Sequence, residues 1–345
     1  MGAADRDLVL REFVGPDGAI TGAAAAVAAR FRLGQVRRVA TLPGAGDRNA
    51  LITTEAGSWV LRLGLDPSTL GGPSSRLPTA LDVLRNERFF AGAITRTSSL
   101  RSPWPYEIDD NRDLLPVPYA VMPRLPGLTL WWSEGRDWGA VGTALAEAAL
   151  DLHRESWPAA GYWDPRTNDI TPSQVDPADA CRVLVGDLIE RTAVTSEPLD
   201  GGSRDWIADC LVHLDADAAS GPCLVHGDLV IGNVCMGEDQ GRWSVTGIFD
   251  FENARIGDPE EDVVVHLWWA CYGGRPEAAV SFLRRYRQER SVSRRIYGYL
   301  VASLLGNWEY GRRMGFPWYG RSRTFRDWAA PLYTDFERVV SATVD

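Results

Sequence analysis

The sequence predicts an α+β fold, in which a small antiparallel sheet near the start of the chain is followed by a larger and mostly helical region. Short β-prone runs separated by Gly or Pro occupy residues 35–63, which is typical of strands joined by tight turns. After Asp262 the apolar residues recur with helical spacing instead. The chain has 345 residues, of which 45% are hydrophobic, so it can bury a large core.

The N-terminal part is expected to contain two helices and four strands. An Ala-rich helix precedes the sheet, with Thr21 as its N-cap, and it is too short to span a bilayer. A loop rich in Gly, Pro and Ser, at 66–78, separates the third strand from the second helix. The helices are predicted at 20–29 and 79–94, and the strands at 35–42, 49–54, 58–63 and 117–122.

The C-terminal part is expected to be helical around one hairpin. An Ala- and Leu-rich stretch at 138–155 predicts a long helix. The apolar run 243–249 predicts a strand that leads directly into Asp250. Three further helices are predicted at 263–272, 278–289 and 295–313.

The stretch 226–262 carries the chemistry. His226-Gly227-Asp228 is followed by Asn233, and the strand that comes next ends at Asp250-Phe251-Glu252. A carboxylate, an amide at a fixed offset and a second carboxylate after a hairpin are what phosphoryl transfer needs. We expect Asp228 to orient and deprotonate an acceptor hydroxyl, and Asn233 and Asp250 to hold Mg²⁺ on the phosphates of a nucleotide.

The order HGDL-x-x-GN followed by DFE-x-A-x-x-GDP-x-x-D resembles the aminoglycoside phosphotransferase-like kinase family, which also contains choline, homoserine and sugar kinases. Gly227 stands where protein kinases have Arg, and Glu252 where they have Gly. The resemblance implies a bilobal protein-kinase-like fold. It places a nucleotide-binding N-lobe at 1–125, and at 126–345 a C-lobe with the catalytic loop and a helical substrate-binding region.

Several residues of the predicted N-lobe are candidates for nucleotide binding. Gly44, Gly46 and Asn49 lie in or beside the first turn of the sheet, where glycine lets the backbone approach phosphate closely. All 36 basic residues of the chain are Arg, and Arg62 stands where the resemblance places the phosphate-binding Lys of kinases. An Arg can bind phosphate through two N–H groups. Glu87 is expected to pair with Arg62; a solvated helix-face Glu is the alternative.

The interlobe hinge is expected at Met122-Pro123-Arg124-Leu125. Adenine needs a backbone acceptor and a backbone donor two residues apart, and these would be the Pro123 C=O and the Leu125 N–H. Met122 would line the pocket, because its thioether adapts to irregular shapes. Ile248, with Cys235, is expected to pack under the base.

Other residues are expected to be structural or to line the acceptor site. His226 would brace the catalytic loop, Asp262 would accept backbone N–H bonds from it, and His266 would pair with Asp262 one turn away. His153 belongs to no motif. One or two aromatic side chains of the C-terminal part are expected to stack on an acceptor ring, from the set Trp268, Trp269, Trp308, Tyr310, Trp318 and Tyr319.

Charge and cysteine usage exclude several partners. A net charge of −10 argues against nucleic acid. The five Cys form no CxxC pair and have no metal-binding spacing, which argues for reduced thiols in the cytoplasm. No stretch resembles a signal peptide or a membrane span. We therefore expect a cytoplasmic protein that has neither nucleic acid nor a membrane as a partner.

The function predicted from the sequence is Mg²⁺-dependent transfer of the γ-phosphate of ATP or GTP to a hydroxyl of a small molecule. The resemblance favours an antibiotic acceptor, whether an aminoglycoside, a nucleoside or another natural product. Two alternatives stay open. One is a kinase of a primary metabolite such as choline, an amino acid or a sugar. The other is a pseudokinase that binds nucleotide, which Arg62 and Glu252 favour and which Asp228, Asn233 and Asp250 oppose.

Overall fold

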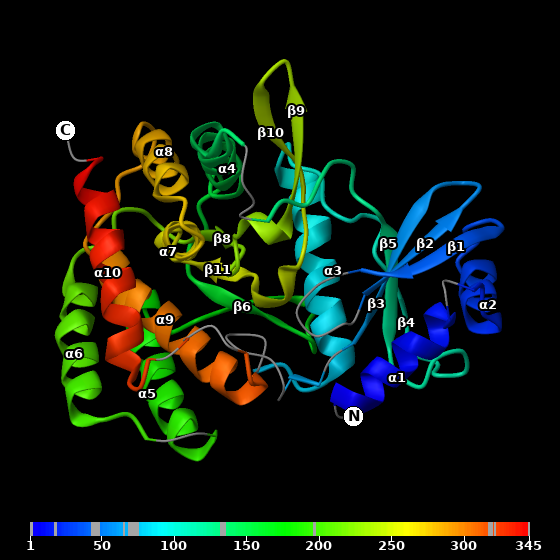
Figure 1. Cartoon of the computed structure of the whole chain (residues 1–345), viewed down its shortest axis with the longest axis horizontal. Helices are drawn as coiled ribbons and strands as arrows, with labels where there is room; N and C mark the ends of the chain where they lie inside the picture. Colours follow the sequence, from blue (N-terminus) through cyan, green and yellow to red (C-terminus); the bar gives the residue numbers. More distant parts are fainter. Residues whose placement is uncertain are drawn as a thin grey trace. The chain divides into compact units, whose positions relative to one another are not determined.

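The computed structural model describes residues 3–16, 19–42, 49–64, 66–67, 76–131, 136–195, 198–316, 320 and 322–343. The chain forms two compact units (Figure 1). The first consists of Met1–Pro126 together with Gly247–Glu252, and the second of Gly127–Thr246 together with Asn253–Asp345. The first unit therefore includes a six-residue segment that comes much later in the sequence than the rest of it.

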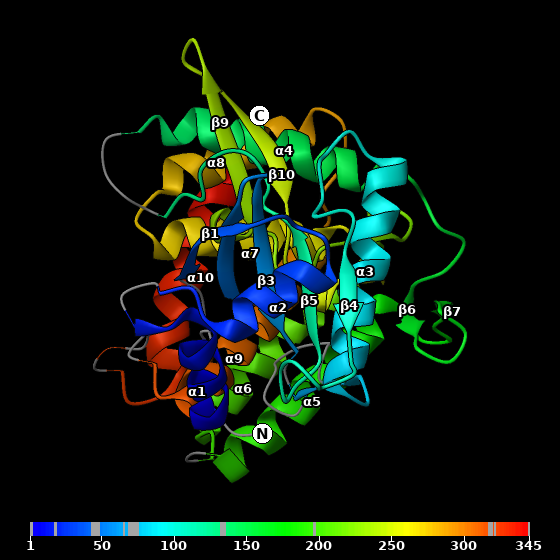
Figure 2. The same cartoon turned by 90° about the vertical axis from the view of Figure 1, so that its right-hand side faces the viewer.

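The first unit is built on a five-stranded antiparallel sheet with the strand order β1-β2-β3-β5-β4 (Figure 2). The predicted strands are confirmed, and the second and third have the predicted bounds. Helix α1 and strand β4 were not predicted. The strands are β1 (Val36–Thr41), β2 (Asn49–Thr54), β3 (Ser58–Leu63), β4 (Glu107–Asp109) and β5 (Tyr119–Pro123), and the helices are α1 (Ala3–Val14), α2 (Gly22–Arg30) and α3 (Ala80–Thr97).

The core of the first unit lies between the sheet and the two N-terminal helices. Phe13 of α1 and Val27 of α2 are fully buried in one cluster with Ile52 and Leu61 of the sheet. The alternation of buried and half-buried residues along β2 is what a strand with one face on a core requires. Thr21 caps α2 as predicted, because its hydroxyl accepts a hydrogen bond from the Ala24 N–H at 3.1 Å.

Helix α3 begins after the N-cap Thr79, one residue later than predicted, and carries Glu87. The Thr79 hydroxyl accepts a hydrogen bond from the Asp82 N–H at 3.2 Å, which satisfies one of the free donors of the first turn. The helix contacts β4 and β5 (Figure 2). Glu87 is 2% exposed, so the alternative of a solvated helix-face Glu is wrong.

The second unit contains most of the helices and two small sheets, with the strand orders β7-β6-β11-β8 and β10-β9. The α+β class is thereby confirmed. Its helices are α4 (Trp138–Leu152), α5 (Pro177–Thr195), α6 (Gly201–Leu211), α7 (Glu260–Tyr272), α8 (Pro276–Arg287), α9 (Arg295–Met314) and α10 (Phe325–Ser341), and its strands are β6 (Gly161–Asp164), β7 (Asp169–Pro172), β8 (Cys223–Val225), β9 (Val234–Asp239), β10 (Arg242–Ile248) and β11 (Arg255–Gly257). The last two residues of β10 belong to the first unit.

Two groups of helices pack within the second unit. Helices α5, α6 and α10 contact α9, and α8 contacts both α4 and α7 (Figure 1). Helices α5, α6 and α10 and the hairpin β6-β7 were not predicted. Trp268 and Trp308, two members of the C-terminal aromatic set, are 1% and 4% exposed and belong to the core. None of the helices in the described ranges is long and apolar enough to cross a membrane.

The first turn of α7 contains a buried carboxyl group with a pH-dependent effect on stability. Glu260 is 1% exposed and accepts hydrogen bonds from the N–H of Ser293 at 2.5 Å and from its hydroxyl at 2.8 Å. Burial, followed by the nearby Asp258, raises the pKa of Glu260 from 4.5 to about 7. Between these two pH values the unfolded chain ionises before the folded one does. Raising the pH through this window therefore removes stability.

We expect Glu260→Gln to make the protein less sensitive to pH between 4.5 and 7, because the amide does not ionise and still has groups to pair with Ser293. Relative to this variant, the wild type should lose about 3 kcal/mol of unfolding free energy across the window, at ~1.4 kcal/mol per pKa unit. Urea denaturation of both proteins at pH 5, 6, 7 and 8 measures the difference. The exposed Glu277 provides the control Glu277→Gln. Parallel curves for wild type and Glu260→Gln would contradict the assignment.

Candidate active site

The turn after β8 holds Asp228 and Asn233 in direct contact. The side-chain amide of Asn233 donates to the backbone oxygen of Asp228 at 2.9 Å and to its carboxylate Oδ2 at 2.8 Å. Both amide hydrogens of Asn233 are thus used on Asp228, which fixes the side-chain orientation and leaves Oδ1 of Asn233 as the acceptor end. The structure thus places the two residues side by side, in a contact that the sequence did not predict.

Steric constraints explain why residue 227 is Gly, where protein kinases have Arg. Its φ is +79°, a conformation that side chains other than glycine rarely adopt. A Cβ at this position would lie 2.6 Å from the backbone oxygen of Asn253 and 2.8 Å from the guanidinium of Arg255. Larger residues are therefore excluded while the turn keeps this path.

Asp262 braces the same turn from the start of α7. It is fully buried, and its two oxygens accept from the backbone N–H groups of His226 and Gly227, each at 2.8 Å. The predicted role of Asp262 is confirmed. Burial acts to raise its pKa, but the His153 ring and the His226 N–H outweigh it, so the pKa of Asp262 stays below its ordinary value.

The expected contact between Asp262 and His266 is wrong, because a histidine from another helix makes it. His153, at the end of α4, places its Nε2 3.1 Å from Oδ2 of Asp262 and its Nδ1 2.9 Å from the hydroxyl of Tyr286. The ring of His266 packs against Phe282 instead, with ring centres 4.4 Å apart. His153 belongs to no short motif, so no local pattern pointed to this contact.

Within the first unit, Arg62 lies among three carboxylates. Its Nε donates to Glu87 Oε1 at 2.9 Å, and its Nη2 lies 2.7 Å from the same oxygen, which confirms the predicted ion pair. Nη2 also donates to Asp250 Oδ1 and lies 3.4 Å from Glu252 Oε2. Burial alone would lower the pKa of Arg62, but Asp250 and Glu87 outweigh it and hold the pKa well above its ordinary value. This guanidinium stays charged.

The segment that carries Asp250 and Glu252 is tied to α3 by a residue that the sequence reading missed. The side-chain amide of Asn86 donates to the backbone oxygens of Phe251 at 3.1 Å and Glu252 at 3.3 Å. Asp250 itself has a φ of +72°, a conformation that Asp tolerates better than most residues. These bonds fix the direction of the Asp250 carboxylate within the first unit.

The remaining candidates for nucleotide binding all fall within the residue ranges of the first unit. Gly44 and Gly46 lie outside the described residues. Asn49 is the cross-strand partner of Arg62 in the pairing of β2 with β3. Its Oδ1 is buried and makes no hydrogen bond within the described part of the chain.

The predicted hinge residues lie at the end of β5 and directly after it. Met122 is buried at 5% exposure, whereas Pro123 and Leu125 are half-buried. Ile248 is fully buried, and its N–H donates to the backbone oxygen of Arg101 at 2.9 Å. The expected contacts of these four residues with adenine stay predictions.

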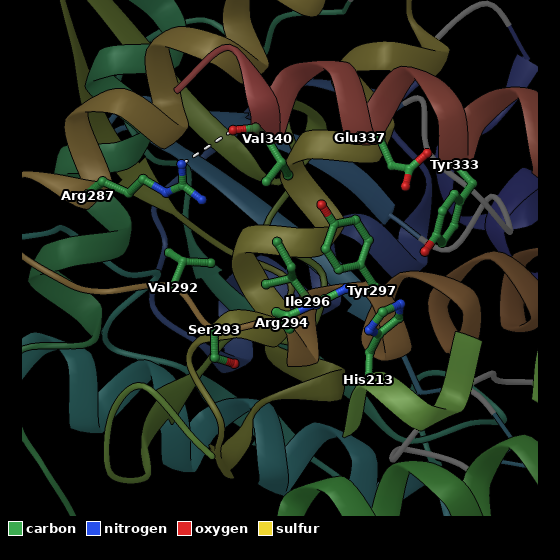
Figure 3. A pocket seen from close by; sticks show the side chains of 10 residues that line it. All are labelled: His213, Arg287, Val292, Ser293, Arg294, Ile296, Tyr297, Tyr333, Glu337 and Val340. Carbon is green, nitrogen blue, oxygen red and sulfur yellow. Dashed lines mark hydrogen bonds between the residues drawn. The ribbon is translucent and has the colours of Figure 1, made fainter. Parts of the chain in front are cut away.

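A cavity of about 270 Å³ lies elsewhere, among the C-terminal helices of the second unit (Figure 3). None of the predicted site residues lines it. Its half-buried cation, Arg287, donates to Val340 O at 3.4 Å and to Thr343 Oγ1 at 2.7 Å, and so stabilises the C-terminal end of α10 (Figure 3). A nucleotide site needs a cation for the phosphates, and Arg287 is already bonded to the C-terminal end of α10. We therefore do not assign this cavity to the nucleotide.

Comparison with known proteins gives the chain a family and a fold. The model of the phosphotransferase enzyme family matches residues 39–298. A search of curated protein sequences finds no match.

Three similar solved structures illustrate the fold. The ternary complex of a thermostable mutant of aminoglycoside phosphotransferase APH(4)-Ia with ADP and hygromycin B is 17% identical, covers 92% of this chain and 98% of its own, and has a TM-score of 0.63. The GDP and kanamycin complex of APH(2")-IIIa is 16% identical, with coverages of 92% and 98% and a TM-score of 0.60. A structure from Ralstonia eutropha, described as a putative aminoglycoside phosphotransferase, is 16% identical, with coverages of 93% and 98% and a TM-score of 0.60. The predicted kinase-like fold is thereby confirmed.

Proposed function

The chain belongs to the phosphotransferase enzyme family, and from that premise we propose that it transfers the γ-phosphate of ATP or GTP to a hydroxyl of a small molecule in a Mg²⁺-dependent reaction. The observation that carries the proposal is the contact between Asp228 and Asn233. The Asn233 amide group holds the Asp228 carboxylate in one orientation, which suits a general base. The Asn233 Oδ1 beside it remains an acceptor, which suits a cation ligand.

Asp228 is the proposed base. Its carboxylate takes the proton of the acceptor hydroxyl as the acceptor oxygen forms a bond to the γ-phosphorus. The bond between that phosphorus and the oxygen bridging it to the β-phosphate breaks, and the nucleoside diphosphate leaves with the electron pair. Asn233 keeps the carboxylate in one orientation. The base is therefore already positioned before the reaction, and the barrier contains no entropic cost for orienting it.

The residues proposed to hold Mg²⁺ offer the donors that this ion prefers. Asn233 presents an amide oxygen and Asp250 a carboxylate, and Mg²⁺ binds hard oxygen ligands, usually one or two carboxylates together with phosphate oxygens. A bound Mg²⁺ would neutralise the charge of the phosphates. Asp250 is itself directed by the N–H groups of Arg62.

Arg62 is proposed to bind the phosphates. A guanidinium that stays charged suits phosphate oxygens, and Glu87 holds it from one side. The proposal extends to Gly44, Gly46 and Asn49 for the phosphates. It also extends to the adenine contacts predicted for the hinge residues and Ile248.

We expect Arg62→Ala to lower turnover by about 10²–10³-fold, as loss of a group that stabilises the transition state typically does, with a smaller change in adenosine affinity. Arg62→Lys should be intermediate, because the ammonium keeps the charge but cannot bond Glu87 and Asp250 in the same forked geometry. Glu87→Gln should be milder, and the double variant little worse than Arg62→Ala. Steady-state kinetics and adenosine titration measure these effects.

Arg38→Ala, an exposed change on β1 of the same sheet, is the matched control and should behave as the wild type does. Thermal unfolding of each variant shows whether the loss is one of folding. Full activity in a folded Arg62→Ala protein would place the phosphate clamp elsewhere, and Arg48, outside the described residues, would be the next candidate.

The proposed acceptor is an antibiotic or a related natural product. The support is the likeness to structures that carry kanamycin or hygromycin B, which are the ligands of those proteins. A primary-metabolite kinase is the second candidate, because the family resemblance extends to choline, homoserine and sugar kinases.

An ATP-consumption assay tests both candidates. The purified protein, with Mg²⁺ and either ATP or GTP, is offered a panel of aminoglycosides, nucleoside antibiotics and other natural products beside choline, amino acids and sugars. Transfer to a member of the first group supports the proposal. Transfer only to the second group moves the function to primary metabolism, and nucleotide binding without any turnover of ATP or GTP favours a pseudokinase.

A further inference from the structure

The segment after the predicted hinge carries an exposed tryptophan on an anchored backbone. Leu128 forms a two-bond bridge with Met236 of β9, with N–O distances of 2.9 and 2.8 Å. Gly127 allows this close approach, because a Cβ there would lie 2.7 Å from the backbone oxygen of Met236. Leu130 then points into the core at 3% exposure, whereas Trp131 is 60% exposed. The bridge fixes the position from which Trp131 projects.

The ring of Trp131 lies against the turn between Asp228 and Asn233. A Cβ at Gly232 would be 3.7 Å from two carbon atoms of the six-membered part of that ring. Gly232 is the middle residue of the 3-10 turn Ile231–Asn233, so it immediately precedes the residue that holds Asp228. One edge of the indole therefore lies about the width of one methyl group from the backbone of the candidate catalytic turn, and most of its surface remains open to solvent.

Packing does not account for this side chain. Trp131 is the most exposed tryptophan of the described chain, and within that part it has no ring partner and no cation over its face. A large ring left in water forgoes the stabilisation that burial gives tryptophan. Trp268 and Trp308 of the C-terminal aromatic set are buried and offer no face to an acceptor.

We propose that Trp131 binds the acceptor, by stacking on a ring that has a flat apolar face, such as the CH face of a sugar or an aromatic base. The inference rests on the proposed phosphotransfer, and it narrows the acceptor to a ring-bearing molecule. The indole of Trp131 would stack on such a ring and hold it beside Asp228, which would then deprotonate one of the hydroxyls of the acceptor. Choline has no ring, but its quaternary ammonium is attracted to an indole face, so choline binding that depends on Trp131, without any effect of Trp131 on the ring-bearing probes, contradicts the inference.

The test is calorimetric titration of three ring-bearing probes, hygromycin B, kanamycin and uridine, into the protein in the presence of AMP-PNP and Mg²⁺. For at least one probe, we expect Trp131→Ala to weaken binding about tenfold and Trp131→Phe to stay within about threefold of wild type, because stacking needs the ring. AMP-PNP affinity should not change. Trp104→Ala, which removes another exposed tryptophan, at 41% exposure, is the control and should bind like the wild type.

Three outcomes overturn the inference: equal probe affinity in Trp131→Ala, a loss of AMP-PNP affinity alone, or no binding of any ring-bearing probe to the wild type. ATP consumption with the acceptor panel described above, measured on the same preparations, tests the phosphotransferase proposal separately. Its absence in the wild type counts against that proposal whatever the titrations show. Its presence together with unchanged probe binding overturns only the role of Trp131.

Discussion

Replacing Asp228 with Asn is expected to lower phosphoryl transfer by about 10²–10⁴-fold, the range typical for loss of a general base, while nucleotide affinity survives. The amide keeps the size of the side chain and can still accept the bond from Asn233, so the turn should keep its shape. What it loses is the ability to take the acceptor's proton. Turnover against the acceptor found by screening, and titration with AMP-PNP, measure the two properties separately.

Asp239, exposed at the end of β9 in the same unit, supplies the matched control Asp239→Asn. It removes one carboxylate without touching the turn and should leave turnover unchanged. Retention of more than half of the wild-type turnover by Asp228→Asn would remove Asp228 from the role of base.

The second large effect is expected for Asp250→Asn. Loss of this carboxylate should weaken Mg²⁺ binding in the nucleotide complex by more than the roughly 10–100-fold that loss of a group supporting a metal ligand typically costs, and turnover should fall with it. Folding should persist, because Arg62 keeps its bonds to Glu87. Titration of Mg²⁺ into the protein with saturating ADP, followed by calorimetry, reads the binding directly.

Glu252→Gln is the discriminating control, because Glu252 pairs with the same Arg62 at 3.4 Å but has no proposed role toward the metal. Carboxylate oxygens of Glu87, Asp250 and Glu252 lie within 4.8 Å of one another, so a cation held by this trio is the competing arrangement. If Glu252→Gln weakens Mg²⁺ binding as much as Asp250→Asn does, the trio and not Asn233 with Asp250 holds the ion.

The sequence predicted elements well where one local signal was strong. Strands β2 and β3 each contain a run of three apolar residues and are separated by a turn that contains Gly57, and their bounds agree with the prediction. Helix α3 was predicted because its apolar residues fall on one broad face. Helix α10 was missed since Pro331 interrupts its pattern, and its stability comes from packing on α6, α7, α8 and α9.

Some residues of the candidate site were likewise predictable from a local pattern, and others were not. Asp228, Asn233 and Asp250 were identified from their order within residues 226–262, and Glu87 from its place in a helix after the Arg62 strand. The contacts of Asn86 with Phe251 and of His153 with Asp262 join residues 165 and 109 positions apart. No local pattern encodes such pairs, so only the folded chain shows them. The exposure of Trp131 likewise depends on which faces the fold leaves uncovered.

The discontinuity of the first unit has a consequence for synthesis on the ribosome. When the ribosome has made β1 to β5, Arg62 can already pair with Glu87, but Asp250, Glu252 and the backbone oxygens that Asn86 binds do not yet exist. Residues 127–246 must be translated first. The nascent unit therefore passes through a stage in which a guanidinium destined for burial has one carboxylate partner instead of three, and it reaches its final charge balance only when residue 252 has left the exit tunnel.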